Sequence, residues 1–251
     1  MLRAYLYKLI RSPLLYVGIV GVMAVCSLRL LPNAVRADYV AYEMMLIIGI
    51  DGNRKMFIIM GALPFAANFA EEWNTMAANH YVIRANPRKY AAANVVTCVL
   101  SSIVTVFVGM TLFAGIYSLF YPFYIPTNNP PTPPYGVLET LGLPFLSMSA
   151  NLFVFSVSCA VWSTMGLMLS AFFPNKYIAI CSPFIFGYVV ERLTMQLPNQ
   201  LNLYLISLSF ITWTGALGAF LYSIALLLGI SVICGTVFTV IVEKRVHNEW
   251  I

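Results

Sequence analysis

The sequence predicts an all-α integral membrane protein. Of its 251 residues, 61% are hydrophobic and only 9% are charged, whereas soluble domains carry about a quarter charged residues. The apolar residues fall in long runs, and a helix needs about 20 of them to cross a bilayer. Because lipid offers the backbone no hydrogen-bond partners, such runs must be helical. We expect one membrane domain that covers 1–251.

Residues 1–12 predict a helix that lies in the membrane interface. Bulky apolar side chains recur at helical spacing and bases stand against them, as in helices that rest among anionic headgroups. The apolar residues are Leu2, Tyr5, Leu6, Leu9 and Ile10, and the bases are Arg3, Lys8 and Arg11. The next apolar run has no clear small-x-small cleavage site, so we expect an elbow helix and not a signal peptide.

Apolar runs predict six transmembrane helices. They cover approximately 13–31, 54–70, 88–121, 145–173, 176–193 and 219–242. The third begins with Asn86 and Pro87, which suit the N-cap and the first helical position. An even number of spans places both termini on the same side of the membrane.

The second span is the shortest, because Met56–Ala70 covers only about 22 Å at a rise of about 1.5 Å per residue. Arg54 and Lys55 would lengthen it by extending toward the headgroups. An alternative extends the span back through 44–50, but that places the polar run "DGNRK" in mid-bilayer at a high cost. We therefore expect 32–53 to be an external, partly interfacial connection.

Lysines and arginines set the orientation, because cytoplasmic segments are enriched in them. With cytoplasmic termini, most of the 14 Lys and Arg lie inside, whereas Arg29, Arg36, Arg54, Lys55 and Arg192 lie outside. The bias predicts a multi-pass protein of a plasma membrane, expected to be bacterial, with N- and C-termini in the cytoplasm.

Two external connections differ in character. Segment 122–144 is rich in proline, which breaks helices, so we expect an extended loop. That loop would either gate or contact cargo, or act as a stiff cap. Segment 194–218 is apolar enough to enter the membrane but too polar to cross it cleanly. It predicts a re-entrant pair of short helices near the outer mouth.

The sequence contains no motif for catalysis or metal binding. His80 and His247 lack paired-histidine spacing, and no lysine follows a Gly-rich loop as in an ATP-binding P-loop. The cysteines lack CxxC spacing and are expected to be buried apolar residues. The bases form no contiguous patch for nucleic acid. We expect a chain without enzymatic activity or a cofactor of its own, embedded in the lipid bilayer.

Amide and hydroxyl side chains within the spans are candidates for a translocation path. They include Asn68, Asn94, Asn151 and Ser158, although interhelical hydrogen bonding is the alternative role of such residues. Acids are expected only outside the spans or at their ends, with Glu191 at the outer boundary. Ion-coupled carriers usually bury ionisable residues, so this pattern does not favour them. A path without charge suits amphipathic or apolar cargo such as peptides, lipids or drugs.

The polar segment 71–86 is expected in the cytosol between the second and third spans. Its leading carboxylates favour the positive end of a helix dipole. On one helix, the spacing places an aromatic, a thioether and an imidazole on a single stripe. The stripe consists of Trp73, Met76, Ala77 and His80. It would face either a protein partner or the bilayer surface, and periodicity does not separate the two.

The same segment carries a family resemblance. Glu71, Glu72 and Thr75 match an acidic stretch and threonine, and 86–89 matches a turn with bases. Asn74 stands where glycine is usual, and Asn94 stands about where a later lysine is expected. With its basic elbow, six predicted spans and broken segment before the last span, the whole chain resembles the membrane-spanning permease of a type-2 ATP-binding-cassette (ABC) exporter.

The resemblance implies a second permease, identical or related, and two separate ABC ATPase subunits that hold ATP and Mg. The ATPases would dock on the coupling segment through Glu71, Glu72, Trp73, Met76, His80 and Arg84. A secondary transporter or channel without an ATPase is the main alternative. A non-transporting membrane scaffold or immunity protein is the other.

Overall fold

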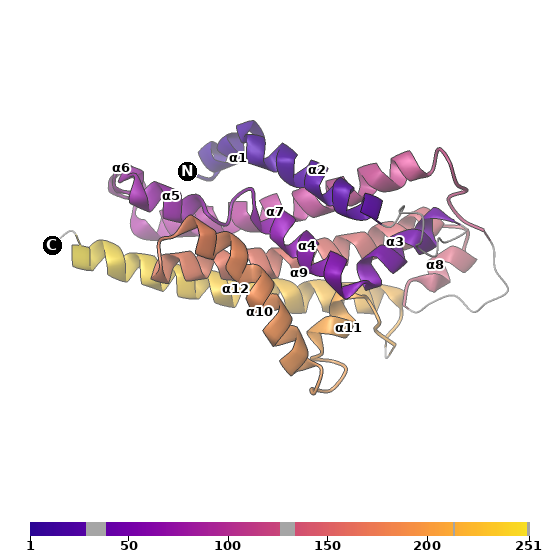
Figure 1. Ribbon diagram of the computed structural model, residues 1–251. Helices are drawn as coiled ribbons and strands as arrows, with labels where there is room; N and C mark the ends of the chain where they lie inside the picture. The colour runs from indigo at the N-terminus through magenta and orange to yellow at the C-terminus, as the bar shows by residue number, and fades with distance from the viewer. Residues whose placement is uncertain (29–38, 126–133, 213, 250–251) are drawn as a thin grey trace.

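The computed structural model describes residues 1–28, 39–125, 134–212 and 214–249, which are helical and contain no strand. Figure 1 shows an elongated bundle of these helices. They are α1 (Leu2–Arg11), α2 (Pro13–Ser27), α3 (Val40–Gly49), α4 (Asp51–Ala62), α5 (Asn68–Asn74), α6 (Ala77–Ala85), α7 (Pro87–Tyr117), α8 (Gly136–Thr140), α9 (Pro144–Phe172), α10 (Lys176–Thr194), α11 (Leu203–Ser207) and α12 (Ala216–Glu249).

Three helices are long and apolar enough to cross a membrane, namely α7, α9 and α12. A fourth candidate is the pair α1 and α2, which pass the same test together and are bent by 58°. The other expected spans fall short of this criterion. Helix α4 has 12 residues, and α10 has 19 residues but includes Pro183, Glu191 and Arg192. The described helices therefore indicate a membrane protein, as predicted.

The two ends of the bundle differ in what they hold. Figure 1 shows α5, α6 and the end of α12 at one end, and α3, α8 and α11 towards the other. The chain begins in α1, on the same side as α5 and α6. We call the end that holds these two short helices the α5–α6 end.

Helix α9 is the centre of the bundle, because it packs against α7, α12, α10 and α4. Its buried hydroxyls mainly donate hydrogen bonds to backbone carbonyls one turn earlier in the same helix. Ser163 also forms a hydrogen bond with the Ser102 hydroxyl of α7 at 3.0 Å. Gly166 lets α10 approach, since a Cβ there would meet Pro183 at 2.7 Å. Small and hydroxylated residues at close helix contacts are typical of membrane helices.

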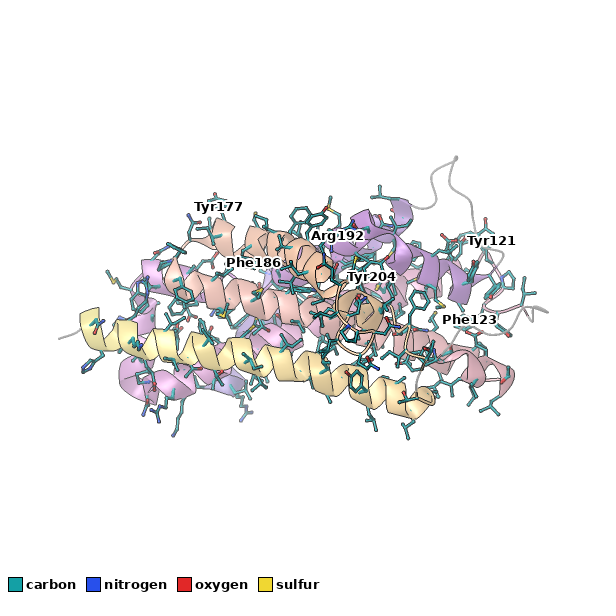
Figure 2. The ribbon with its side chains drawn as sticks, turned by 90° about the horizontal axis from the view of Figure 1, so that it is seen from below. Tyr121, Phe123, Tyr177, Phe186, Arg192 and Tyr204 are labelled. Atoms are coloured by element: carbon teal, nitrogen blue, oxygen red, sulfur yellow. The ribbon has the colours of Figure 1, made fainter. Side chains whose placement is uncertain are left out.

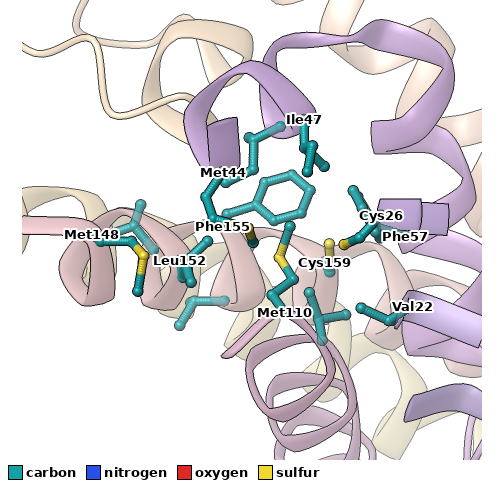
Figure 3. Packing of buried hydrophobic residues seen from close by; sticks show 14 of the residues in the cluster. Val22, Cys26, Met44, Ile47, Phe57, Met110, Met148, Leu152, Phe155 and Cys159 are labelled. Carbon is teal, nitrogen blue, oxygen red and sulfur yellow. The ribbon is translucent and has the colours of Figure 1, made fainter. Parts of the chain in front are cut away.

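Helix α3 belongs to the hydrophobic core, whereas the sequence predicts that 32–53 is an external, partly interfacial connection. Met44 and Ile47 are fully buried, and Figure 3 shows both beside Phe155 of α9. Phe57 of α4 meets Phe155 edge to ring, with centroids 5.7 Å apart. The chain enters the core in α3, breaks at Ile50 and continues in α4.

The expected span 54–70 is not one helix. Helix α4 ends at Ala62, a turn follows, and α5 begins at Asn68. The turn contains Pro64, which lacks a backbone N–H and whose ring clashes with the carbonyl of the preceding turn. Hydropathy gives no sign of this break, because residues on both sides of it are apolar.

The structure describes parts of the two segments that the sequence predicts to be external. The proline-rich run 126–133 lies outside them, but Val40 and Ala41 donate backbone hydrogen bonds to Pro122 and Phe123 at 3.1 and 3.2 Å. In segment 194–218, α10 runs to Thr194 and α12 begins at Ala216. Between them the described residues form one short helix, α11, in place of the predicted pair.

Candidate functional site

A buried cluster at the α5–α6 end joins three helices around one carboxylate. Glu72 of α5 accepts hydrogen bonds from the Tyr5 hydroxyl at 2.7 Å, the Tyr90 hydroxyl at 2.8 Å and Lys8 Nζ at 2.8 Å. Lys8 also donates to Asn68 at 2.6 Å. We call this group the Glu72 cluster: Tyr5 and Lys8 of α1, Asn68 and Glu72 of α5, and Tyr90 and Asn94 of α7.

The Glu72 carboxylate is charge-compensated although it is only 4% exposed. A buried carboxylate needs a cation and hydrogen-bond donors to offset its lost hydration. Lys8 supplies the cation, and the two phenols supply neutral donors. Burial, together with the nearby Glu72 carboxylate, raises the pKa of Tyr5 well above its ordinary value. Tyr5 therefore stays protonated and remains a donor.

Two of the predicted path residues belong to this cluster. Asn68 donates to the Asn94 side chain at 2.8 Å, and Asn94 in turn donates to the Tyr90 carbonyl at 3.2 Å. Both side chains are buried. Their observed bonds are therefore interhelical and local, which is the alternative that the sequence left open.

The predicted docking stripe does not lie on one helix. Thr75 ends α5, and Met76 has φ 59°, a left-handed conformation uncommon for residues other than glycine. A new helix, α6, then begins at Ala77. The stripe is thus divided between two helices, with Trp73 before the break and His80 after it.

The predicted docking residues differ in exposure. Met76 is 66% exposed, and Glu71 and His80 are also exposed. Trp73 is half-buried, 5.5 Å from the Phe69 ring and 5.7 Å from the Arg245 guanidinium of α12. Glu72 is buried in the Glu72 cluster. The side chain of Arg84 lies outside the described part of the structure.

The remaining two path residues lie elsewhere on α9. Asn151 is 8% exposed and lines a cavity beside α3 and α11. Ser158 is buried two turns further along the same helix. The four predicted path residues therefore form no common lining: Asn68 and Asn94 meet each other, and Asn151 and Ser158 stand apart from them.

A second buried cluster was not predicted. Glu191 of α10 accepts from Arg54 Nη2 at 2.8 Å through one oxygen and from Lys55 Nζ through the other. The three side chains are between 1% and 6% exposed. The prediction that Arg54 and Lys55 extend to the headgroups is corrected: they and Glu191 bury one another between α4 and α10.

This Arg54 cluster extends to α11 and to the molecular surface. Arg54 donates to Ser207 Oγ at 3.2 Å, and its guanidinium lies 4.5 Å from the Tyr204 ring centroid. Asp51 approaches Lys55 at 3.8 Å and Arg192 at 4.0 Å. Figure 2 shows Arg192 and Tyr204 on the same side of the molecule, away from Tyr177 at the start of α10. We define the Arg54 cluster by its charged members, Asp51, Arg54, Lys55, Glu191 and Arg192.

Arg54 is the least satisfied member of the cluster. Its Nε and Nη1 atoms are buried and have no hydrogen-bond partner among the residues that the structure describes. Such orphaned donors are costly in a protein interior and rare in native structures. The sequence gives one signal for the cluster, the i,i+4 pair Asp51 and Lys55. Glu191 lies 136 residues beyond Lys55, so no local pattern predicts that they meet.

Among the described residues, no group of three or more His, Cys, Asp or Glu side chains is arranged to hold a metal ion. Cys26, Cys98, Cys159 and Cys234 are buried thiols, as predicted, whereas Cys181 is exposed. Comparison of the chain with family models, curated proteins and solved structures finds no match in any of the three.

Proposed function

We propose that this chain is the permease subunit of an ATP-driven ABC exporter, which works with a second permease and two ATPase subunits. In this proposal the membrane is crossed by six helices: α2, α4, α7, α9, α10 and α12. Two of the shorter ones are extended by a neighbouring helix, α2 by α1 and α4 by α5. The α5–α6 end faces the cytoplasm. The cargo is an amphipathic or apolar molecule.

The observation that supports this proposal best is the Glu72 cluster. An exporter driven from outside its own chain needs a segment that receives force and passes it to the spanning helices. Glu72 ties α5 directly to α1 and α7 through buried bonds. A displacement of α5 would therefore move α1 and α7 together, and α7 packs along α9.

Further contacts connect α5 with the rest of the same end. Asn74 donates to the Pro174 carbonyl, in the turn between α9 and α10, at 2.9 Å. Arg88 at the start of α7 pairs with Glu243 of α12 at 2.5 Å, and Arg245 donates to the Phe172 carbonyl at 2.7 Å. The helices that would have to move together are thus linked at the end where the ATPases would bind.

The exposed residues around the break between α5 and α6 form the surface for docking. Met76 offers an apolar thioether, and Glu71 and His80 flank it with polar groups. An exposed apolar anchor surrounded by polar residues is typical of the centre of a protein interface. Trp73 supports this surface from below, because it packs on Phe69 and Arg245.

Met76→Asp tests the proposal. Aspartate tolerates a left-handed backbone better than methionine does, so the variant should insert and fold. The tagged chain is purified with its partners from its own cells after gentle solubilisation, and recovery of a nucleotide-binding subunit and Mg-ATP hydrolysis are measured. We expect both to fall about tenfold or more in the variant, because a hot-spot loss of about 2 kcal/mol or more is involved.

The matched control is Leu141→Asp, which places the same change on a side chain of almost equal exposure, 67%, outside the α5–α6 end. It should leave recovery and hydrolysis unchanged. Purification of the intact chain without any nucleotide-binding subunit would contradict the proposal.

A secondary carrier is the second candidate, and the Arg54 cluster favours it. Buried ionisable residues in membrane bundles commonly serve ion or proton pathways, and Arg54, Lys55 and Glu191 are such residues. The chain alone would then carry protons. Proton uptake into proteoliposomes that enclose a pH-sensitive dye should then depend on the presence of the chain. An exporter permease shows no such uptake.

A further inference from the structure

A cavity of about 440 Å³ opens between α3, α9 and the segment that follows α11. This volume lies within the range of about 300–1,000 Å³ typical of small-molecule sites. Its wall is mainly apolar, with Met45 and Leu46 of α3 and Phe210 among its residues. Such a wall accommodates a hydrocarbon chain.

One side of the cavity is polar. Asn151, Ser207 and Ser209 contribute to its lining. Ser207 Oγ accepts the hydrogen bond of Arg54 Nη2 at 3.2 Å, so the guanidinium lies directly behind this part of the wall. Ser209 has φ 59°, and a residue held in that conformation marks a constrained position in the wall.

The charge behind the polar side is not balanced. In the Arg54 cluster three cations, Arg54, Lys55 and Arg192, face two carboxylates, Asp51 and Glu191, which leaves one positive charge. Arg54 also keeps two donor nitrogens without partners. Charges are poorly screened in a protein interior. The field at Ser207 therefore favours an anion over a neutral or cationic group.

Another acid on α3 does not face this cavity. Glu43 is buried, but it is not among the lining residues. At about 100° per residue, it points about 100° away from Tyr42 and about 60° away from Leu46, which do line the cavity. The carboxylate therefore does not occupy the place of an anion beside Ser207.

We propose that this cavity binds an amphipathic anion with a single hydrocarbon chain, such as an alkyl phosphate or a fatty carboxylate. The chain lies against Met45 and Leu46, and the anionic group accepts from the Ser209 hydroxyl in the field of Arg54, because the Ser207 hydroxyl already donates to the Tyr204 carbonyl at 2.9 Å. Small-molecule sites commonly combine such apolar walls with a few polar groups. The proposal concerns this chain alone and holds whether or not ATPase subunits bind it.

Direct binding tests the proposal. Radiolabelled dodecyl phosphate is added to the purified full chain in nanodiscs of zwitterionic lipid, with dodecanol and dodecyltrimethylammonium as neutral and cationic probes of equal chain length. We expect saturable binding of dodecyl phosphate at one per chain. Dodecanol should bind about tenfold or more weakly, because it lacks a charge-assisted hydrogen bond, and the cation should not compete.

A matched pair of variants locates the site. Ser209→Asp places a carboxylate where the anionic group would lie and should weaken dodecyl phosphate binding at least about tenfold. Ser209→Asn has nearly the same size without charge and should retain binding. Both side chains tolerate the left-handed backbone of this position.

Two results would overturn the proposal. One is equal affinity for dodecyl phosphate and dodecanol, and the other is equal binding by Ser209→Asp and Ser209→Asn. A two-chain phosphatidic acid probe separates the sources of the anion: competition by it as strong as by dodecyl phosphate would assign the site to bilayer lipid. Competition by dodecyl phosphate alone would assign it to free single-chain amphiphiles.

Discussion

Tyr5 and Glu72 are joined by a 2.7 Å hydrogen bond between residues 67 positions apart. Through this bond α1 is attached to α5, a helix far from it in the sequence. The bond is buried, so water does not compete for either partner. The bond therefore helps to fix the position of α1 on the folded bundle.

Tyr5→Phe should lower the free energy of unfolding by about 1–3 kcal/mol, because it leaves one oxygen of a buried carboxylate with fewer donors. Denaturant titration of the purified chain in detergent measures this. Tyr7→Phe is the control, since Tyr7 is on the same helix and 57% exposed. Equal stability of the two variants would show that the Tyr5 hydroxyl contributes nothing to the Glu72 cluster.

Glu191→Gln should be strongly destabilising, by about 3–5 kcal/mol, because it leaves Arg54 and Lys55 buried without their shared carboxylate. The measurement is the same denaturant titration. Arg192→Gln is the control, because Arg192 is next in sequence but its side chain is 57% exposed. We expect it to change stability by only about 0–1 kcal/mol, as is usual for a surface ion pair. A small effect of Glu191→Gln would contradict the buried arrangement.

Gly166→Ala should disrupt the contact between α9 and α10. The added Cβ would meet the Ala179 carbonyl oxygen and lie 2.7 Å from Pro183, and neither the backbone nor the proline ring can yield easily. We expect a loss of about 1–3 kcal/mol, measured by thermal unfolding. Gly229→Ala, in α12, meets nothing within 4 Å and should be neutral or stabilise the helix by up to about 1 kcal/mol.

Alkaline pH should destabilise the protein partly through Tyr135. Burial raises the pKa of Tyr135 to about 12, against about 10 in an unfolded chain. The unfolded state therefore releases this proton first, and the free energy of unfolding falls as pH rises from about 10 to about 12. Below pH 10 the contribution is constant. Thermal unfolding measured between about pH 10 and pH 12 should show a smaller loss of stability for Tyr135→Phe than for the unchanged protein. The control Tyr16→Phe, at an exposed position, should leave the loss unchanged.

The spacing of apolar residues is sufficient to predict most helix positions. The expected spans 88–121, 145–173 and 176–193 begin within one residue of α7, α9 and α10. The N-cap prediction is confirmed in detail, because the Asn86 side chain accepts from the Arg88 backbone N–H at 3.2 Å. A helix, α1, is present where the elbow helix is predicted. These features depend on local sequence, which is why they can be predicted.

Features that depend on distant partners cannot be predicted in this way. By hydropathy alone the polar run at the start of α4 is too costly to bury, but Arg54 and Lys55 find Glu191 on α10, and a paired charge costs far less than an isolated one. That pairing allows α3 to pack in the core. Likewise, the sequence predicts that Glu72 faces a partner, and its actual donors come from α1 and α7. No spacing rule within one segment contains this information.

The long separation within the Glu72 cluster has a consequence for biosynthesis. At about 5–20 residues per second, the 67 residues between Tyr5 and Glu72 take several seconds to emerge from the ribosome. During that interval Tyr5 has none of its hydrogen-bond partners in the Glu72 cluster. Asn94, 89 residues after Tyr5, arrives later still. The bonds that hold α1 in the Glu72 cluster therefore form only after α5 and the first turns of α7 have been made.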